Sequence, residues 1–225
     1  MNNMNIWEIL NIPVNDWDNL LKIKYKQNTE VGGIFCDVGA ASGLITSLFK
    51  EIAGDKGKVY SFEMNKNNYN SIINLSSENC IIENIAISDK SEVVNIYADN
   101  NNSHNYTSNI IGYNSSYINM DIIGNVNSIS LDEYFLNKSL DYLKIDVEGA
   151  ELKVINGGIE TIKKCKYVII ECHFTEDWEN IYDLLKLNNL DFKNLLDDSP
   201  IYLGDTKILP GINNNGMPHQ IYLKK

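Results

Sequence analysis

The chain has 225 residues, of which 44% are hydrophobic, and it carries a net charge of −11 with no arginine. This length suits one α/β domain with a sizeable core, and the lack of an apolar run of about 20 residues excludes a membrane span. A net negative charge without arginine disfavours nucleic acid as a partner. We expect a soluble, cytoplasmic protein. The sequence leaves the oligomeric state open.

The first 30 residues carry two groups of apolar side chains separated by Pro13, which predicts two short helices as an N-terminal helical cap. Residues 31–225 are expected to form the main domain. We find no basic stretch followed by an apolar run and a small-residue cleavage site, so no secretory signal is expected. The cysteines lack the CxxC spacing of zinc sites and are expected to be free, buried thiols. They are Cys36, Cys80, Cys165 and Cys172.

A strand, a tight turn and a helix are predicted in succession from residue 34 onward. Residues 34–38 are β-prone, residues 39–43 read Gly-Ala-Ala-Ser-Gly, and apolar residues at helical spacing begin at Leu44. A helix that begins there points unpaired backbone N–H groups and the positive end of its dipole into the turn, which suits an anionic ligand group. The glycines are expected to let a ligand approach closely. The alternative is a plain αβ turn without a ligand.

Glu63 ends a second predicted strand, residues 58–62. A carboxylate at this position of a βαβ unit can accept both ribose hydroxyls of an adenosine. The turn itself lacks the second glycine that admits a pyrophosphate in the dinucleotide fingerprint. With Asp37 two residues before Gly39, the pattern D-x-G-x-x-x-G resembles the first motif of S-adenosylmethionine-dependent methyltransferases, whose cofactor has a carboxylate and no phosphate.

A helix over residues 65–76 and a third strand over residues 81–87 follow in the predicted order. Ala86 and Ile87 end this strand at the same edge as the turn, where they could flank an adenine ring. An ordinary strand end explains these two residues equally well.

Residues 92–97 and 126–130 are two further predicted strands, separated by a stretch rich in Asn, Ser and Tyr. Long loops inside compact domains are usually functional or disordered, so residues 98–125 are a candidate substrate loop. Its tyrosines could stack on a sugar or an aromatic face, and a mobile loop without function is the alternative. These tyrosines are Tyr106, Tyr113 and Tyr117.

A second motif lies at the end of a fourth predicted strand. Residues 144–151 read Lys-Ile-Asp-Val-Glu-Gly-Ala-Glu and follow an L-D-x-x segment that begins at Leu131. This run closely resembles the FkbM family of methyltransferases, whose mark is K-I-D-V-E-G-x-E. Together with the first motif, the resemblance covers about residues 30–175.

The resemblance implies a Rossmann-like class I methyltransferase, an α/β fold that transfers a methyl group from S-adenosylmethionine to a hydroxyl, often on a sugar or a polyketide. The expected sheet is mostly parallel and seven-stranded, with helices on both faces. Residues 167–171 are its fifth strand, a helix covers residues 177–189, and residues 190–196 and 220–223 form a final antiparallel hairpin.

Ligands of open α/β sheets bind beyond the carboxyl ends of the strands, and the candidate site residues are predicted to meet at that edge. The candidate cofactor-binding residues are Asp37, Gly39, Ala40, Ala41, Ser42, Gly43, Glu63, Met64, Ala86, Ile87 and Asp146. The candidate catalytic residues are His173 as a general base, Glu148 and Asp146. Asp146, Glu171 and His173 could also hold a divalent cation such as Mg²⁺, although a structural histidine and acids that merely complement a helix dipole are alternatives.

Two other functions remain open from the sequence. A nicotinamide-dependent oxidoreductase is disfavoured by the turn, because the glycine that admits a pyrophosphate is missing. A non-catalytic adenosine-binding or scaffold domain on the same fold is disfavoured by the grouping of Asp146, Glu148 and His173 at one edge. Equilibrium binding of the cofactors would separate these functions from a methyltransferase.

Overall fold

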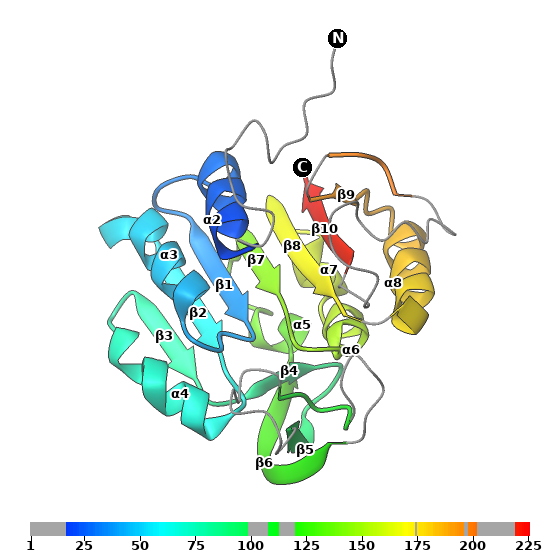
Figure 1. The fold of residues 1–225 in the computed structure, drawn as a ribbon. Coiled ribbons are helices and arrows are strands. Elements are labelled where there is room, and N and C mark those ends of the chain that lie inside the picture. Colours follow the sequence, from blue (N-terminus) through cyan, green and yellow to red (C-terminus); the bar gives the residue numbers. More distant parts are fainter. Residues whose placement is uncertain (1–16, 99–107, 113–119, 174, 196–197, 202–218) are drawn as a thin grey trace.

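The computed structural model describes residues 17–98, 108–112, 120–173, 175–195, 198–201 and 219–225 (Figure 1). Its centre is a seven-stranded sheet in the order β3-β2-β1-β7-β8-β10-β9. Neighbouring strands from β3 to β8 are parallel, whereas β10 is antiparallel to both β8 and β9. The predicted mostly parallel sheet with a final antiparallel hairpin is confirmed. Its strands are β1 (Ile34–Val38), β2 (Lys58–Phe62), β3 (Cys80–Glu83), β7 (Tyr142–Ile145), β8 (Tyr167–Cys172), β9 (Lys193–Asn194) and β10 (His219–Lys224).

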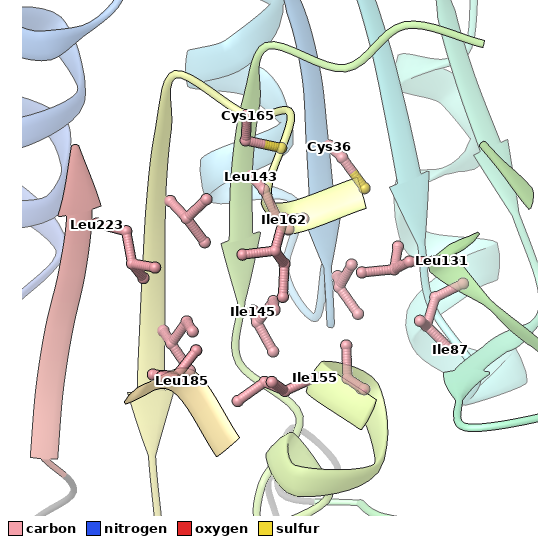
Figure 2. Packing of buried hydrophobic residues seen from close by; sticks show 14 of the residues in the cluster. Cys36, Ile87, Leu131, Leu143, Ile145, Ile155, Ile162, Cys165, Leu185 and Leu223 are labelled. Atoms are coloured by element: carbon pink, nitrogen blue, oxygen red, sulfur yellow. The ribbon is translucent and has the colours of Figure 1, made fainter. Parts of the chain in front are cut away.

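Helices pack on both faces of this sheet because its inner strands bury alternate side chains on opposite sides. On β1, Phe35 packs with α2 and α3, whereas Cys36 and Val38 pack with α5 to α8. Figure 2 shows Leu143 and Ile145 of β7 within this second core. The helices are α2 (Trp17–Asn28), α3 (Leu44–Ala53), α4 (Lys66–Ile72), α5 (Leu131–Tyr134), α6 (Glu151–Asn156), α7 (Ile159–Ile162) and α8 (Thr175–Leu187), with short 3₁₀ turns η1 (Gly54–Lys56) and η2 (Ile73–Leu75).

A second sheet of three strands, in the order β4-β6-β5, lies at the end of the main sheet toward which β1, β2 and β7 point (Figure 1). Its strands are β4 (Ala86–Ser88), β5 (Glu92–Ala98) and β6 (Asp121–Ser130). The single strand predicted over residues 81–87 is therefore wrong. The Asn84 side-chain amide donates to the carbonyl oxygens of Glu63 and Met64 at 2.8 and 2.9 Å, and the chain leaves the main sheet at this residue.

Two other predicted boundaries differ from the structure. Strand β6 begins at Asp121 rather than at residue 126, because the poor strand formers Gly124 and Asn125 are held in place by pairing with β5. Strand β9 covers only Lys193–Asn194, and directly after it the chain turns back, with the N–H of Asp198 donating to the carbonyl oxygen of Asn194 at 3.0 Å. The substrate loop predicted over residues 98–125 thus ends earlier, and its three tyrosines lie outside the described residues.

The four cysteines are free and buried, as predicted. Of the two helices expected in residues 1–30, the second is α2, and the first falls outside the described residues. Helix α2 packs against the main sheet through Leu21 and Tyr25, and the Tyr25 hydroxyl donates to the carbonyl oxygen of Leu143 at 3.0 Å. No helix within the described ranges is both long and apolar enough to cross a membrane.

Candidate active site

The turn between β1 and α3 is shaped by two glycines in the left-handed region, Gly39 (φ +83°) and Gly43 (φ +78°). A Cβ atom on Gly39 would lie 1.8 Å from the carbonyl oxygen of Asp146, and one on Gly43 would lie 2.9 Å from Ile72. Both glycines are therefore required by the approach of other protein atoms. The expectation that they also let a ligand approach closely stays a prediction.

Glu63 is fixed beside this turn by two backbone donors. The N–H of Ala41 donates to Glu63 Oε2 at 2.8 Å, and the N–H of Asn65 donates to Oε1 at 2.7 Å. The residue is 5% exposed, and burial raises the pKa of its carboxyl, although the two N–H groups oppose that shift. Each oxygen can accept a further hydrogen bond, so the carboxylate is held in one orientation with capacity for a ligand.

A buried row of polar groups lies beneath the turn. Asp37 on β1 is in register with Lys144 on β7 and with Ser61 on β2. The Thr46 hydroxyl donates to Asp37 Oδ2 at 2.7 Å and is 2.8 Å from the Ser61 hydroxyl. Lys144 Nζ lies 3.4 Å from Asp37 Oδ1 and 3.1 Å from Asp146 Oδ2, and it donates to the carbonyl oxygen of Gly39 at 2.8 Å. Lys144 therefore joins the two sequence motifs.

A cavity opens between the turn, the end of β2, the small sheet and the segment after β7. The space between these elements is about 560 Å³, including the part open to solvent. It is lined by Val38, Gly39, Ala41, Phe62, Glu63, Met64, Ile85, Ala86, Ile87, Ser108, Ile110, Asp146, Val147, Glu148 and Ala150. Most of the predicted cofactor residues thus surround one cavity.

Four predicted cofactor residues are not part of this lining. Asp37 and Ala40 are buried behind it, Ser42 is exposed, and Gly43 packs against α4. Ala86 and Ile87 do line the cavity, but they begin β4 rather than end β3. The predicted convergence at the strand ends is therefore achieved in part by the second sheet.

The segment after β7 turns sharply, with Glu148 (φ +53°) and Gly149 (φ +105°) both in the left-handed region. Glu148 is not a glycine, so its conformation stores strain of about 1–3 kcal/mol that surrounding contacts must offset. Asn109, which is 1% exposed, donates from Nδ2 to the carbonyl oxygen of Glu148 at 3.1 Å. Asn109 thereby fixes part of the predicted substrate loop to the turn that carries Glu148.

His173 lies at the centre of four carboxylates, and its side chain is 9% exposed. Its Nδ1 is 2.9 Å from Glu151 Oε1. Its Nε2 is 3.5 Å from Glu148 Oε2, 3.7 Å from Glu171 Oε1 and 3.8 Å from Asp146 Oδ1. Ligand atoms of Asp146, Glu171 and His173 all lie within 4.8 Å of one another, so the structure brings the predicted cation ligands together. We call His173 and its four carboxylate neighbours the carboxylate–histidine cluster. These neighbours are Asp146, Glu148, Glu151 and Glu171.

The charges in this cluster shift one another's pKa values. Burial alone would lower the pKa of His173, but the carboxylates, Glu151 foremost, hold it well above its usual 6.5. Burial raises the pKa of Glu148 to about 7, although His173 opposes that shift. Burial would also raise the pKa of Asp146, but Lys144 and His173 hold it below its ordinary value. The pKa of Glu148 thus lies close to neutral pH.

Three residues that matter at this site were not singled out from the sequence. Lys144 interrupts an apolar strand, and a lysine that is buried on a strand requires carboxylate partners. Its position in the sequence could therefore have predicted a buried ion pair. Glu151 was read only as part of the second motif, where an acid in the first turn of a helix is common. Asn109 lies in an asparagine-rich stretch, and nothing in the sequence distinguishes it from its neighbours.

The sequence profile described as "Methyltransferase FkbM domain" matches residues 37–193. No curated protein matches the chain. Among solved structures, the methyltransferase FkbM of Methylobacillus flagellatus KT is 14% identical with a TM-score of 0.47; the match covers 85% of this chain and 43% of that protein, so the chain spans less than half of its length.

Two other solved structures are similar over most of the chain. A candidate rRNA methylase from Clostridium thermocellum is 9% identical, with a TM-score of 0.57 and coverage of 95% of this chain and 98% of that one. An S-adenosylmethionine-dependent O-methyltransferase from Thermotoga maritima is 15% identical, with a TM-score of 0.50 and coverage of 97% and 70%. These similarities concern the fold alone.

Proposed function

The chain belongs to the FkbM methyltransferase family, and from that premise we propose that it moves a methyl group from S-adenosylmethionine to a hydroxyl oxygen of a small molecule or glycan, with a sugar as the acceptor class. Residues 31–225 are assigned to the methyltransferase domain and residues 1–30 to an N-terminal helical cap. The observation that carries the proposal is one cavity with a fixed carboxylate, Glu63, and the acids Asp146 and Glu148 in its lining.

In this proposal the adenosine lies along the side of the cavity formed by the second strand and the small sheet. Glu63 would accept the two ribose hydroxyls, and Met64, Ala86 and Ile87 would flank the adenine. The sulfonium group would then lie toward Asp146. Ala40, Ser42 and Gly43 would act by shaping the backbone of the turn, since they do not line the cavity.

Binding measurements test the cofactor assignment. We expect calorimetry to detect S-adenosylmethionine and its demethylated product, with NAD binding at least tenfold more weakly because the turn lacks the glycine that admits a pyrophosphate. NAD binding as tight as that of S-adenosylmethionine would favour an oxidoreductase. Binding of the cofactor without any methyl transfer would favour the non-catalytic alternative.

The proposed reaction is an in-line displacement on the sulfonium methyl. The acceptor oxygen forms a bond to the methyl carbon as the carbon–sulfur bond breaks, and the hydroxyl proton passes to a base. His173 was the first candidate for that base, but the surrounding carboxylates favour its protonated form, which has no free lone pair. Glu148 is the better candidate, because its pKa is raised to about 7 and it lines the cavity.

A divalent cation held by Asp146, Glu171 and His173 is a second form of the same proposal. Such an ion would lower the pKa of a bound hydroxyl, and it would require a neutral His173. Activity that is lost on chelation and restored by Mg²⁺ or Mn²⁺ would support the cation. Full activity in chelator would assign proton removal to the cluster itself.

The acceptor is proposed to be a hydroxylated small molecule or glycan rather than nucleic acid. The chain has a net charge of −11 and no arginine, and Lys144, which contacts Gly39 and Asp146 of the cavity lining, is buried and paired with Asp37 and Asp146. Screening glycans, polyols and RNA for labelled methyl transfer tests this directly. Transfer to RNA but not to any hydroxylated small molecule would overturn the acceptor assignment.

A further inference from the structure

Glu151 is a buried acid that directly contacts both the strained turn and His173. It begins α6 and is 1% exposed. Its Oε1 atom accepts the backbone N–H of Val147 at 3.2 Å and that of Gly149 at 3.1 Å. The same oxygen lies 2.9 Å from His173 Nδ1. One carboxylate oxygen thus joins the turn after β7 to the end of β8.

We propose that Glu151 is the positioning residue of the site, which holds the His173 ring so that Nε2 faces Glu148, Glu171 and Asp146. This inference rests on the proposed methyl transfer for its consequence, but not for its geometry. With Nδ1–H donated to Glu151, Nε2 is the ring atom left to face the other three carboxylates. This holds whether Nε2 carries a proton or binds a cation, because a histidine that ligates a metal also donates its other N–H to an outer partner.

The convergence of three donors on one oxygen makes the position of that oxygen, rather than its charge, the property that decides how the His173 ring is oriented. The N–H groups of Val147 and Gly149 require an acceptor at the Oε1 position. A glutamine at position 151 would therefore place its carbonyl oxygen there and keep its NH₂ group away from the ring. An aspartate would keep the charge, but its shorter side chain could not reach the turn and the ring together.

This reasoning gives a matched pair of variants, Glu151→Gln and Glu151→Asp. The chain has three histidines, so ¹⁵N-histidine labelling with His173→Ala for assignment makes the ring N–H observable. We expect a hydrogen-bonded, downfield Nδ1–H signal in the wild type and in Glu151→Gln, and its loss in Glu151→Asp. A signal that survives in Glu151→Asp, or that is lost equally in both variants, would overturn the proposal.

Turnover provides the second readout, with the acceptor found by the labelled-methyl screen. We expect Glu151→Asp to lower kcat by about 10²-fold, the cost of a misplaced reacting group, and Glu151→Gln to stay within about tenfold of wild type. The KM for S-adenosylmethionine should change little in either variant, because Glu151 does not line the cavity. Loss of kcat in Glu151→Gln with kcat retained in Glu151→Asp would assign the effect to charge and not to position, and equal loss in both variants would also contradict the proposal.

The controls are Glu160→Gln and Glu160→Asp, which alter an exposed acid on α7 and should leave both readouts at wild-type values. Thermal unfolding of each variant identifies any that fails to fold, and Glu151→Gln then still tests the proposal, because it keeps all three contacts. If the wild type binds no S-adenosylmethionine, the proposed function fails. The ring N–H measurement needs no cofactor and so judges the Glu151 assignment separately.

Discussion

The ammonium group of Lys144 donates to the carbonyl oxygen of Gly39 at 2.8 Å, so a residue of the second motif holds the turn of the first. Lys144 is buried, and its charge is balanced by Asp37 and Asp146. Burial would lower the pKa of Lys144, but these two carboxylates raise it above the ordinary value. Both parts of the candidate site are therefore coupled through one ion-pair network.

Removing the Lys144 ammonium should strongly destabilise the fold. Lys144→Met leaves Asp37 and Asp146 without their cation, and breaking a buried pair costs about 3–5 kcal/mol. Urea unfolding measures the change in the free energy of unfolding, with Lys164→Met, at an exposed lysine, as the control. The double variant Lys144→Met/Asp37→Asn should recover part of the loss. A single variant within ~1 kcal/mol of wild type would contradict the role of this network.

Glu63→Gln should weaken cofactor binding more than it weakens the fold. The amide replaces one acceptor oxygen with a donor, and a charge-assisted hydrogen bond is worth ~1.5–3 kcal/mol, so the Kd for S-adenosylmethionine should rise about 10- to 100-fold. In Glu63→Gln the side-chain NH₂ group would face one of the backbone N–H groups of Ala41 and Asn65, which now donate to the carboxylate. Thermal unfolding must therefore be measured as well, to separate a loss of stability from a loss of binding. Glu83→Gln, at the end of the neighbouring strand and outside the cavity lining, should bind as wild type does. Unchanged binding by Glu63→Gln would remove Glu63 from the ribose site.

The two turn glycines should differ in their tolerance of alanine. At Gly39 the added Cβ meets a backbone carbonyl and φ is positive, so strain of ~1–3 kcal/mol and overpacking of ~1–3 kcal/mol should add. At Gly43 the added Cβ would lie 2.9 Å from a side-chain atom of Ile72, so a smaller shift relieves the overlap than at Gly39, where the distance to the carbonyl oxygen is 1.8 Å. We expect a larger fall in Tm for Gly39→Ala than for Gly43→Ala. Equal falls would indicate that backbone strain alone matters at this turn.

The strands next to the turn were predictable because glycines bound them. Strand β1 lies between Gly33 and Gly39, and β2 begins after Gly57, so the predicted bounds of both strands agree with the structure. The end of the third strand was not predictable from the sequence. Asn84 interrupts a mostly apolar run there, through side-chain hydrogen bonds to the carbonyl oxygens of Glu63 and Met64 that only the folded chain reveals. The second motif predicted where the carboxylate–histidine cluster lies. The role of each residue in the cluster depends on distances between side chains, which the spacing of residues along the sequence does not give.

Asn109 should link the described part of the predicted substrate loop to the strained turn. Its Oδ1 accepts the N–H groups of Ile111 and Gly112, and its Nδ2 donates to the carbonyl oxygen of Glu148. Asn109→Ala removes three partly buried hydrogen bonds, at a cost of about 0.5–1.5 kcal/mol each. Hydrogen exchange should speed up at residues 108–112 and at the Glu148 turn, while β1 stays protected. Faster exchange in the loop alone would show that the two segments are not coupled.

The substrate-loop prediction is tested by the same measurement in the wild-type protein. Ser108 and Ile110 line the cavity, so a bound acceptor should slow the hydrogen exchange of their backbone N–H groups. We expect this protection with an acceptor that is methylated and not with an inert analogue. Equal exchange with and without the acceptor would assign the loop a structural role only.

Glu148 should give the protein a stability that falls as the pH rises toward neutrality. Burial raises the pKa of Glu148 from 4.5 to about 7 in the folded protein. Between these values the folded state binds more protons than the unfolded state, so the stabilisation is complete below the lower value and is lost as pH passes the upper one. His173, whose pKa is also raised, adds a loss of the same sign at higher pH.

Replacing Glu148 with glutamine removes its part of this dependence. The free energy of unfolding, measured by urea titration in chelator, should therefore fall less steeply in Glu148→Gln than in the wild type between about pH 5 and 7. The exposed-site variant Glu160→Gln should retain the wild-type slope in that window. Parallel curves for wild type and Glu148→Gln would mean that the pKa of Glu148 is the same in the folded and the unfolded protein. A carboxylate with so low a pKa is a weak base for the hydroxyl proton, and proton removal would have to be assigned to another group of the cluster or to a bound cation.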